Sequence, residues 1–261
     1  MRIAVVNQKG GVGKTTAVLG LASAAGPGQG IEGGRTLVVD LDPQSNATTS
    51  LLGTPLDDDA VTILDVLEDG RQGAAGAPGV IMGTSYRDVD LIPADGHLAR
   101  WEKASGPGVE QRLRKVLDCD LIAGYELVLF DCPPSLGNLS TGALVAADYA
   151  LIVTEPAVNG VRGVDKVLDT IDAVIEFYNP ALSVAGVLVN RVPPRSNEAA
   201  HRISELEAAL PGLVRKPFIP ARVAVSEAQG RHRPVHGFVE DVAEYFTTHL
   251  QILQEVDRAQ A

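Results

Sequence analysis

Two lysines and three glycines lie close together near the start of the chain. The sequence reads Lys9-Gly10-Gly11-Val12-Gly13-Lys14-Thr15-Thr16 directly after an apolar run at residues 3–7. Glycines allow a turn in which successive backbone N–H groups point inward, and the first turn of a following helix adds partial positive charge. A strand, a glycine-rich turn and a helix in this order predict a loop that binds the phosphates of a nucleotide.

The side chains of this loop indicate MgATP as its ligand. We expect Lys14 to reach the β- and γ-phosphates and the hydroxyl of Thr15 to bind Mg²⁺. The strict phosphate-loop motif, Gly-x-x-x-x-Gly-Lys-Ser/Thr, would begin with glycine where this chain has Gln8. Lys9 is a lysine in addition to the one that the motif requires. The loop is therefore the deviant form of the motif. Its predicted nucleotide-binding residues are Gly10, Gly11, Val12, Gly13, Lys14, Thr15 and Thr16, and Lys9 and Lys14 are predicted to take part in catalysis.

Three aspartates follow two further apolar runs. Asp40 lies near the end of the run at residues 36–41 and Asp42 follows that run directly, and Asp131 ends the run at residues 127–131, before Pro133-Pro134-Ser135. Carboxylates at this edge of a parallel sheet lie beside the nucleotide, where one can orient Mg²⁺ through water and another the attacking water. We assign Asp40 and Asp131 to the metal and Asp42 to catalysis. For Asp40 or Asp42, the alternative is a cap on the helix that starts near Gln44.

The rest of the chain alternates short β-branched apolar runs with longer segments of helical period. This pattern predicts one α/β domain over residues 1–261, with a mostly parallel, twisted sheet covered by helices on both faces. The predicted strands are residues 3–7, 36–41, 89–93, 127–131, 149–154 and 185–190. The predicted helices are residues 15–25, 109–117, 137–147, 161–177, 196–210 and 239–256. Residues 26–34 and 72–79 are rich in glycine and proline and predict surface loops.

Composition narrows the class of protein. Hydrophobic residues make up 45% of the chain and aromatic residues only 4%, as is typical of parallel sheets covered by helices. Cys119 and Cys132 offer neither a disulfide framework nor paired metal ligands, which favours a reducing cytoplasm. No signal peptide and no apolar run of about 18 residues is evident, so we expect a soluble, unprocessed protein.

The net charge of -11 argues against a protein that coats nucleic acid with its whole surface. The charged residues are nevertheless unevenly distributed along the chain. Residues 186–236 contain eight Lys or Arg against four Glu, a net charge of +4, which leaves -15 to the remainder. This basic segment is the candidate surface for an acidic partner.

The three motifs together resemble those of the ParA/Soj partition ATPases. The resemblance rests on residues 7–16, on Asp40-Leu41-Asp42-Pro43-Gln44 and on Asp131-Cys132-Pro133-Pro134-Ser135, and it continues to Ile219-Pro220 and Val225-Ser226-Glu227-Ala228. It implies a P-loop ATPase in which ATP closes two subunits face to face. Lys9 would then reach the partner's nucleotide, Asp42 would position water, and Asn190 with Pro220 would lie at the nucleotide. A turn residue at the end of a strand is the alternative for Asn190.

The same resemblance implies binding to double-stranded DNA without sequence preference, and ATP hydrolysis stimulated by a ParB-like partner at the nucleoid. Relatives often carry arginines where this chain has Ala221 and Ala224. The DNA contacts would then depend on other arginines of the basic segment, chiefly Arg191, Arg195, Arg222, Arg231 and Arg233. The chain starts directly on its first strand, so we expect the short form without an N-terminal helix-turn-helix.

Three alternatives share some of these features. A MinD-like ATPase would bind membrane through a C-terminal amphipathic helix, but residues 237–261 carry five acidic residues and one arginine, which argues against it. A metabolic kinase, ligase or iron–sulfur reductase would need pocket residues or thiolates that we cannot assign. An ATPase that positions another cargo would share every motif.

Overall fold

A computed structural model describes residues 1–26, 34–57, 59–69 and 76–260. The described strands form one eight-stranded sheet in the order β3-β4-β2-β5-β1-β6-β7-β8. All neighbouring strands pair in parallel except β3 and β4, which are antiparallel. The strands are β1 (Arg2–Val6), β2 (Thr36–Asp40), β3 (Met82–Gly83), β4 (Val89–Ile92), β5 (Leu127–Asp131), β6 (Tyr149–Thr154), β7 (Ser183–Val189) and β8 (Val214–Arg215).

All six strands predicted from the sequence are present, with bounds that differ by at most two residues. The central strands β2, β5 and β6 are buried along their whole length, which explains their uninterrupted apolar runs. The sequence analysis missed β3 and β8. Each has two residues, too few to show alternation between polar and apolar side chains.

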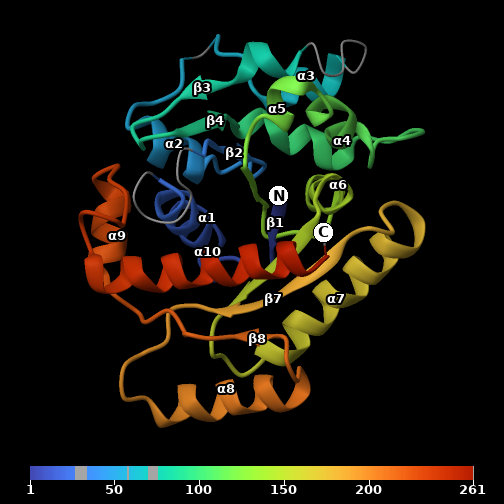
Figure 1. Cartoon of the computed structure of the whole chain (residues 1–261). Coiled ribbons are helices and arrows are strands. Elements are labelled where there is room, and N and C mark those ends of the chain that lie inside the picture. Colours follow the sequence, from blue (N-terminus) through green and yellow to red (C-terminus); the bar gives the residue numbers. More distant parts are fainter. Residues whose placement is uncertain (27–33, 58, 70–75, 261) are drawn as a thin grey trace.

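Helices cover both faces of the sheet (Figure 1). One apolar core joins the sheet to α1 (Lys14–Ala24), α2 (Asn46–Leu52), α9 (Val223–Gly230) and α10 (Glu240–Gln260). The other core joins it to α3 (Ile63–Asp69), α4 (Arg112–Leu117), α5 (Asp120–Ala123), α6 (Asn138–Ala146), α7 (Gly160–Phe177) and α8 (Asn197–Ala209). The predicted fold class, a mostly parallel sheet between two layers of helices, is confirmed.

The six predicted helices correspond to α1, α4, α6, α7, α8 and α10. The helices α3, α5 and α9 were not predicted from the sequence, and α2 was expected only as a helix that starts near Gln44. These helices have four to eight residues each, too few turns to show a helical period. Of the two predicted loops, residues 27–33 and 72–75 lie outside the described part of the chain. The second loop was predicted to extend to residue 79, which is wrong, because a 3-10 helix covers Ala77–Val80.

The C-terminal helix α10 lies against α1, as Figure 1 shows. Its apolar face, which includes Phe246 and Leu250, is buried, and Phe246 packs directly on Gly20 of α1. None of the helices in the described residues is long and apolar enough to cross a membrane.

Candidate nucleotide-binding site

The phosphate loop lies between the end of β1 and the start of α1. Gly13, the last residue before α1, has a φ of 88°. A Cβ atom at Gly13 would come within 2.1 Å of the Asn190 side-chain nitrogen, so both the backbone conformation and the space require glycine. Asn7 braces the start of the loop, because its amide donates to the Val153 carbonyl at 2.7 Å and accepts from the Lys9 N–H at 2.9 Å.

Lys14 is buried at the centre of this loop. Its ammonium donates to the carbonyl of Asn7 at 3.2 Å and to that of Lys9 at 3.5 Å. Burial lowers the pKa of Lys14, while the negative charge of Asp131 opposes that shift. A cation held by two neutral carbonyls is poorly compensated, so a phosphate would be a better partner.

A cavity of about 440 Å³ opens in front of the loop. Its walls come from the phosphate loop, from the segment after β2, from the turn after β5 and from the segment that ends α9. Its lining residues are Gly10, Gly11, Gly13, Lys14, Thr15, Thr16, Asp42, Asn46, Thr49, Ser50, Pro134, Arg191, Gln229, Gly230 and His232. The structure therefore brings Lys14, Thr15 and Asp42 to one space, together with four of the other predicted loop residues. Val12 is fully buried behind the loop.

Asp40 holds the segment that carries Asp42. One carboxylate oxygen of Asp40 accepts from the Thr48 N–H and hydroxyl, both at 2.8 Å, and the other accepts from the Asp42 N–H at 3.0 Å. Burial raises the pKa of Asp40 to about 6, and the hydrogen bonds from Thr48 oppose the shift. Since both oxygens are engaged, the geometry favours Asp40 as a positioning residue over a direct contact with Mg²⁺.

Asp42 itself is 8% exposed and faces the cavity. One of its oxygens accepts from the Gln44 N–H at 3.0 Å, which fixes the carboxylate at the start of the turn before α2. This bond lies in the turn before α2 and does not cap the helix, whose first turn instead donates to Asp40 through the Thr48 N–H. The turn holds Asp42 where a water near the phosphates could be oriented.

Asp131 is completely buried, and neither of its carboxylate oxygens has a hydrogen-bond partner among the described residues. Burial and the nearby Asp40 raise the pKa of Asp131 well above its usual range, and the positive charge of Lys14 opposes this shift. Unpaired buried carboxylates are costly unless a cation joins them. The residues present therefore fit Mg²⁺, with Thr15 and Asp131 as the groups that would hold the ion and its waters.

Lys9 lies at the mouth of the site, and its side chain is 56% exposed. Its ammonium is 3.3 Å from one carboxylate oxygen of Glu155, and the guanidinium of Arg191 is 3.5 Å from the other. Arg191 also donates to the carbonyl of Gly11. Glu155 therefore connects the extra lysine of the loop to the segment that follows β7.

Asn190 and Pro220 lie on the other side of the phosphate loop. The Asn190 amide donates to the Val12 carbonyl at 3.1 Å and accepts from the Arg191 N–H at 2.8 Å. Together with Thr16 and Pro220, Asn190 lines a small hollow beside the main cavity. The side chain thus braces the loop, and the hollow next to it is where we propose that the adenine binds.

The predicted DNA-binding arginines differ in their surroundings. Arg191 pairs with Glu155, and Arg222 pairs with Asp241 of α10 at 3.2 Å. Arg231 lies over the ring of Phe238, 5.7 Å from its centroid. In the part of the chain that the structure describes, no carboxylate lies within 4.0 Å of the side-chain nitrogens of Arg195, Arg231 or Arg233. These three exposed arginines are therefore the ones best placed to donate hydrogen bonds to phosphate groups.

Several residues of the cavity wall were not predicted from the sequence, among them Asn46, Thr49 and Ser50 of α2 and, much later in the chain, Gln229 and His232. Gln229, in the last turn of α9, donates from its amide to the Thr16 hydroxyl at 3.1 Å, and His232 follows three residues later. Both belong to a short helix and turn more than 200 residues after the loop. No local pattern indicates that this segment folds over the phosphate site.

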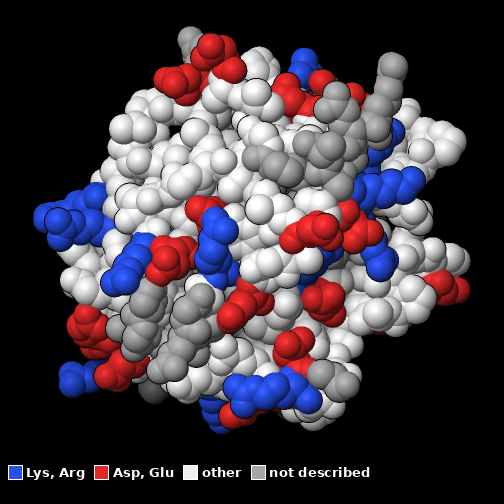
Figure 2. Space-filling model, turned by 45° about the horizontal axis from the view of Figure 1, so that its top comes forward, with Lys and Arg blue, Asp and Glu red and all other residues white. Residues whose placement is uncertain are grey.

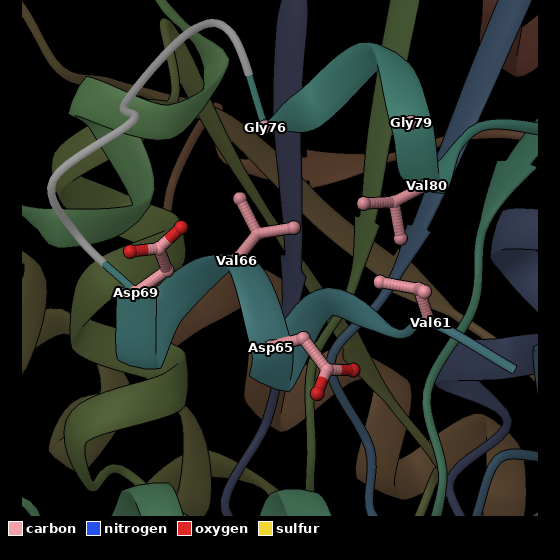
Figure 3. A pocket seen from close by; sticks show the side chains of 7 residues that line it. All are labelled: Val61, Asp65, Val66, Asp69, Gly76, Gly79 and Val80. Atoms are coloured by element: carbon pink, nitrogen blue, oxygen red, sulfur yellow. The ribbon is translucent and has the colours of Figure 1, made fainter. Parts of the chain in front are cut away.

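A separate hollow of about 250 Å³ lies between α3 and the 3-10 helix Ala77–Val80 (Figure 3). Valine side chains, including Val66 and Val80, point toward one another across it, and Asp65 and Asp69 lie at its rim. The carboxylate of Asp65 accepts from the N–H of Thr62 at 2.7 Å, so it caps α3. None of the residues predicted to bind nucleotide lines this hollow.

Comparisons with known proteins agree with this geometry. Residues 1–184 match a protein family model described as an AAA domain. A cobyrinic acid a,c-diamide synthase from Mycobacterium smegmatis, solved with bound ADP and magnesium, is 30% identical with a TM-score of 0.80 over 100% of this chain and 96% of that chain. The fold and the site therefore define a P-loop ATPase that uses ATP and Mg²⁺.

Among the relatives are the sporulation initiation inhibitor protein Soj of Bacillus subtilis and the chromosome partitioning protein ParA of Myxococcus xanthus. Each is 34% identical over 89% of this chain, covering 89% of Soj and 80% of ParA. The apo McdA structure from Cyanothece has a TM-score of 0.84 at 22% identity, over 97% of this chain and 98% of that chain, which supports the fold. The chain belongs to the ParA/Soj family of partition ATPases.

Proposed function

We propose that this ATPase separates DNA molecules through an ATP-dependent cycle of dimerisation and DNA binding. MgATP would close two copies of the chain face to face, and the closed dimer would bind double-stranded DNA without sequence preference. Hydrolysis, stimulated by a ParB-like protein bound to the DNA cargo, would return the chain to a monomer. The protein would act in the cytoplasm at the nucleoid, with residues 1–261 as one domain.

The observation that carries this proposal is the exposed Lys9 beside the nucleotide cavity. Lys14 already supplies a buried cation to the phosphates, and Asp42 and Asp131 supply the carboxylates. Lys9 instead lies at the rim of the cavity, where its ammonium forms an ion pair with Glu155. Because this pair is exposed to solvent, it contributes little to stability. A second nucleotide brought to this rim offers a stronger anionic partner than one carboxylate.

The DNA-binding step is supported by the arginines that lack carboxylate partners. Arg195 lies in the turn before α8, and Arg231 and Arg233 lie after α9. Each copy of the chain would present one such set, and a dimer would double the number of phosphate contacts. Figure 2 shows one face of the molecule, on which basic and acidic side chains are interspersed. DNA binding by a monomer should accordingly be weak.

Two rival functions fit the structure less well. A membrane-bound relative would need a free apolar helix face, whereas the apolar face of α10 is buried against α1. A synthase like the Mycobacterium smegmatis protein would consume ATP together with a second substrate. Release of phosphate from ATP in the absence of any metabolite would argue against the synthase.

The proposal is tested by measuring the dimer directly. Light scattering with a non-hydrolysable ATP analogue and Mg²⁺ should show a dimer for the wild type and a monomer without nucleotide. Lys9→Ala should bind the analogue yet remain a monomer, because it retains Lys14 but lacks the ammonium at the rim. Glu155→Gln should dimerise at least as well as the wild type, since Lys9 no longer has to leave a carboxylate.

Lys14→Ala is the control that should lose nucleotide binding itself. A wild-type protein that stays monomeric with the analogue at micromolar concentration would refute the dimer. Wild-type dimerisation by Lys9→Ala would refute the role of Lys9.

A further inference from the structure

His232 stands out in the wall of the nucleotide cavity because its backbone is in an unusual conformation. Its φ is 54°, in the left-handed region that side chains other than glycine rarely adopt. A residue in this conformation destabilises the fold unless the surrounding structure holds it in place, and such residues are often found at functional sites.

The segment around His232 is fixed from both sides. The His232 N–H donates to the carbonyl of Gln229 at 3.0 Å, and the Arg233 N–H donates to that of Ala228 at 2.9 Å. On the far side, the Tyr86 hydroxyl donates to the carbonyl of Arg233 at 2.9 Å. These bonds account for how the conformation is maintained, but they do not explain why this position has an imidazole.

The imidazole of His232 also has an unsatisfied nitrogen. Its Nδ1 is covered by protein and has no hydrogen-bond partner among the described residues. Such a nitrogen usually has a partner, and leaving it without one costs stability. The ring lies against Gly53 at the end of α2, where a Cβ atom would come within 3.4 Å of the His232 Cβ.

A nucleotide offers oxygen acceptors to the tautomer of His232 that carries its proton on Nδ1. His232 lines the same cavity as Lys14, Thr15 and Asp42, on the wall formed by α9 and α2. Because Nδ1 is covered in this structure, a contact with the nucleotide requires the ring to turn toward the cavity that His232 lines. We propose that His232 is a nucleotide-binding residue whose Nδ1–H donates to an oxygen of bound MgATP.

This contact would also connect the nucleotide to α2. The segment before α2 carries Asp42, and Asn46, Thr49 and Ser50 of α2 line the cavity opposite the phosphate loop. A histidine that turns from Gly53 toward the nucleotide would change its packing on this helix. The contact belongs to the ATP site, so its test depends on neither dimerisation nor DNA binding.

Two substitutions at this position distinguish the effect of the imidazole ring from the effect of the left-handed backbone conformation. His232→Gly removes the ring and accepts the left-handed backbone without strain, so the fold should be as stable as the wild type or more stable. His232→Asn also tolerates this backbone, and its side-chain nitrogen takes the position of Nδ1. Asp88→Gly is the matched control, because Asp88 also has a positive φ, of 58°, but does not line the cavity.

The measurement is the Kd for a fluorescent ATP analogue with Mg²⁺, together with the thermal unfolding midpoint without nucleotide. Loss of one hydrogen bond predicts that His232→Gly raises the Kd about three- to tenfold while the midpoint does not fall. His232→Asn should stay within about twofold of the wild type, and Asp88→Gly should bind as the wild type does. A wild-type Kd in His232→Gly, or an equal rise in both His232 variants, would overturn the assignment.

Discussion

Asp131 is the residue whose environment departs furthest from what an ionised carboxylate prefers. It is fully buried, lacks hydrogen-bond partners among the described residues, and pairs in register with Asp40 on the neighbouring strand. Burial and Asp40 raise its pKa well above the usual range, and burial raises that of Asp40 to about 6. The protein without metal therefore carries an electrostatic cost that Mg²⁺ would relieve.

This cost has a defined dependence on pH. Because the pKa values of the two carboxyls are raised in the folded state, their contribution to stability is present at about pH 4 and is lost as the pH rises through 6 and above. Asp131→Asn should therefore raise the free energy of unfolding without Mg²⁺ by about 1 to 3 kcal/mol at pH 8, and by little at pH 4. The same variant should lose the rise in melting temperature that MgATP gives the wild type.

Urea unfolding at the two pH values, without metal, measures the first effect, and a thermal scan with MgATP measures the second. A metal-free Asp131→Asn variant that is less stable than the wild type at pH 8 would contradict this account.

At the scale of elements, two glycines in helices should respond to alanine in opposite ways. A Cβ atom at Gly20 in α1 would lie 2.5 Å from ring atoms of the buried Phe246, whereas one at Gly163 in α7 would have no neighbour within 4 Å. We expect Gly20→Ala to lower the free energy of unfolding by about 1 to 3 kcal/mol through overpacking. Gly163→Ala should raise it by up to about 1 kcal/mol through helix propensity.

Urea denaturation followed by circular dichroism compares the two variants. Adding Phe246→Leu to Gly20→Ala should recover part of the loss, because it makes space for the methyl group. Equal effects of alanine at the two positions would show that contact between α1 and α10 is looser than the structure indicates.

The sequence predicted the elements that carry long, regular patterns. The central strands, buried on both faces, read as apolar runs, and the phosphate loop could be found because its residues are contiguous. The elements that were not predicted are short, and the site residues that were not predicted come from α2, from α9 and from the turn after α9. The position of Gln229 over Thr16 results from tertiary packing between segments far apart in the chain, which no local period encodes.

At the scale of the whole molecule, DNA binding should depend on a few arginines set against a net charge of -11. If each subunit makes about three phosphate contacts, the ATP-bound dimer makes about six, and log affinity should fall against log salt with a slope of about -5. Replacing Arg231 and Arg233 by Glu removes two contacts per subunit. The slope should then fall to about -2, and binding at low salt should be lost or nearly lost.

Fluorescence anisotropy on two unrelated DNA duplexes, with a non-hydrolysable ATP analogue, measures both slope and sequence preference. The matched control replaces Arg114 and Lys115 of α4 by Glu, an equal change of charge in the helix layer on the other face of the sheet. Equal loss of binding in the two double variants would mean that net charge alone governs binding. No loss in either would exclude Arg231 and Arg233 as contacts.

The packing of α10 on α1 sets an order of events during synthesis. A ribosome produces α1 directly after the first strand, but it produces Phe246 and Leu250, which cover that helix, only near the end of the described chain. Until α10 has been synthesised, the helix that follows the phosphate loop therefore exposes an apolar side to water. Exposed apolar surface on a nascent chain is prone to aggregation and is a target for chaperones. The nascent protein should accordingly depend on chaperones that act at the ribosome until α10 has emerged.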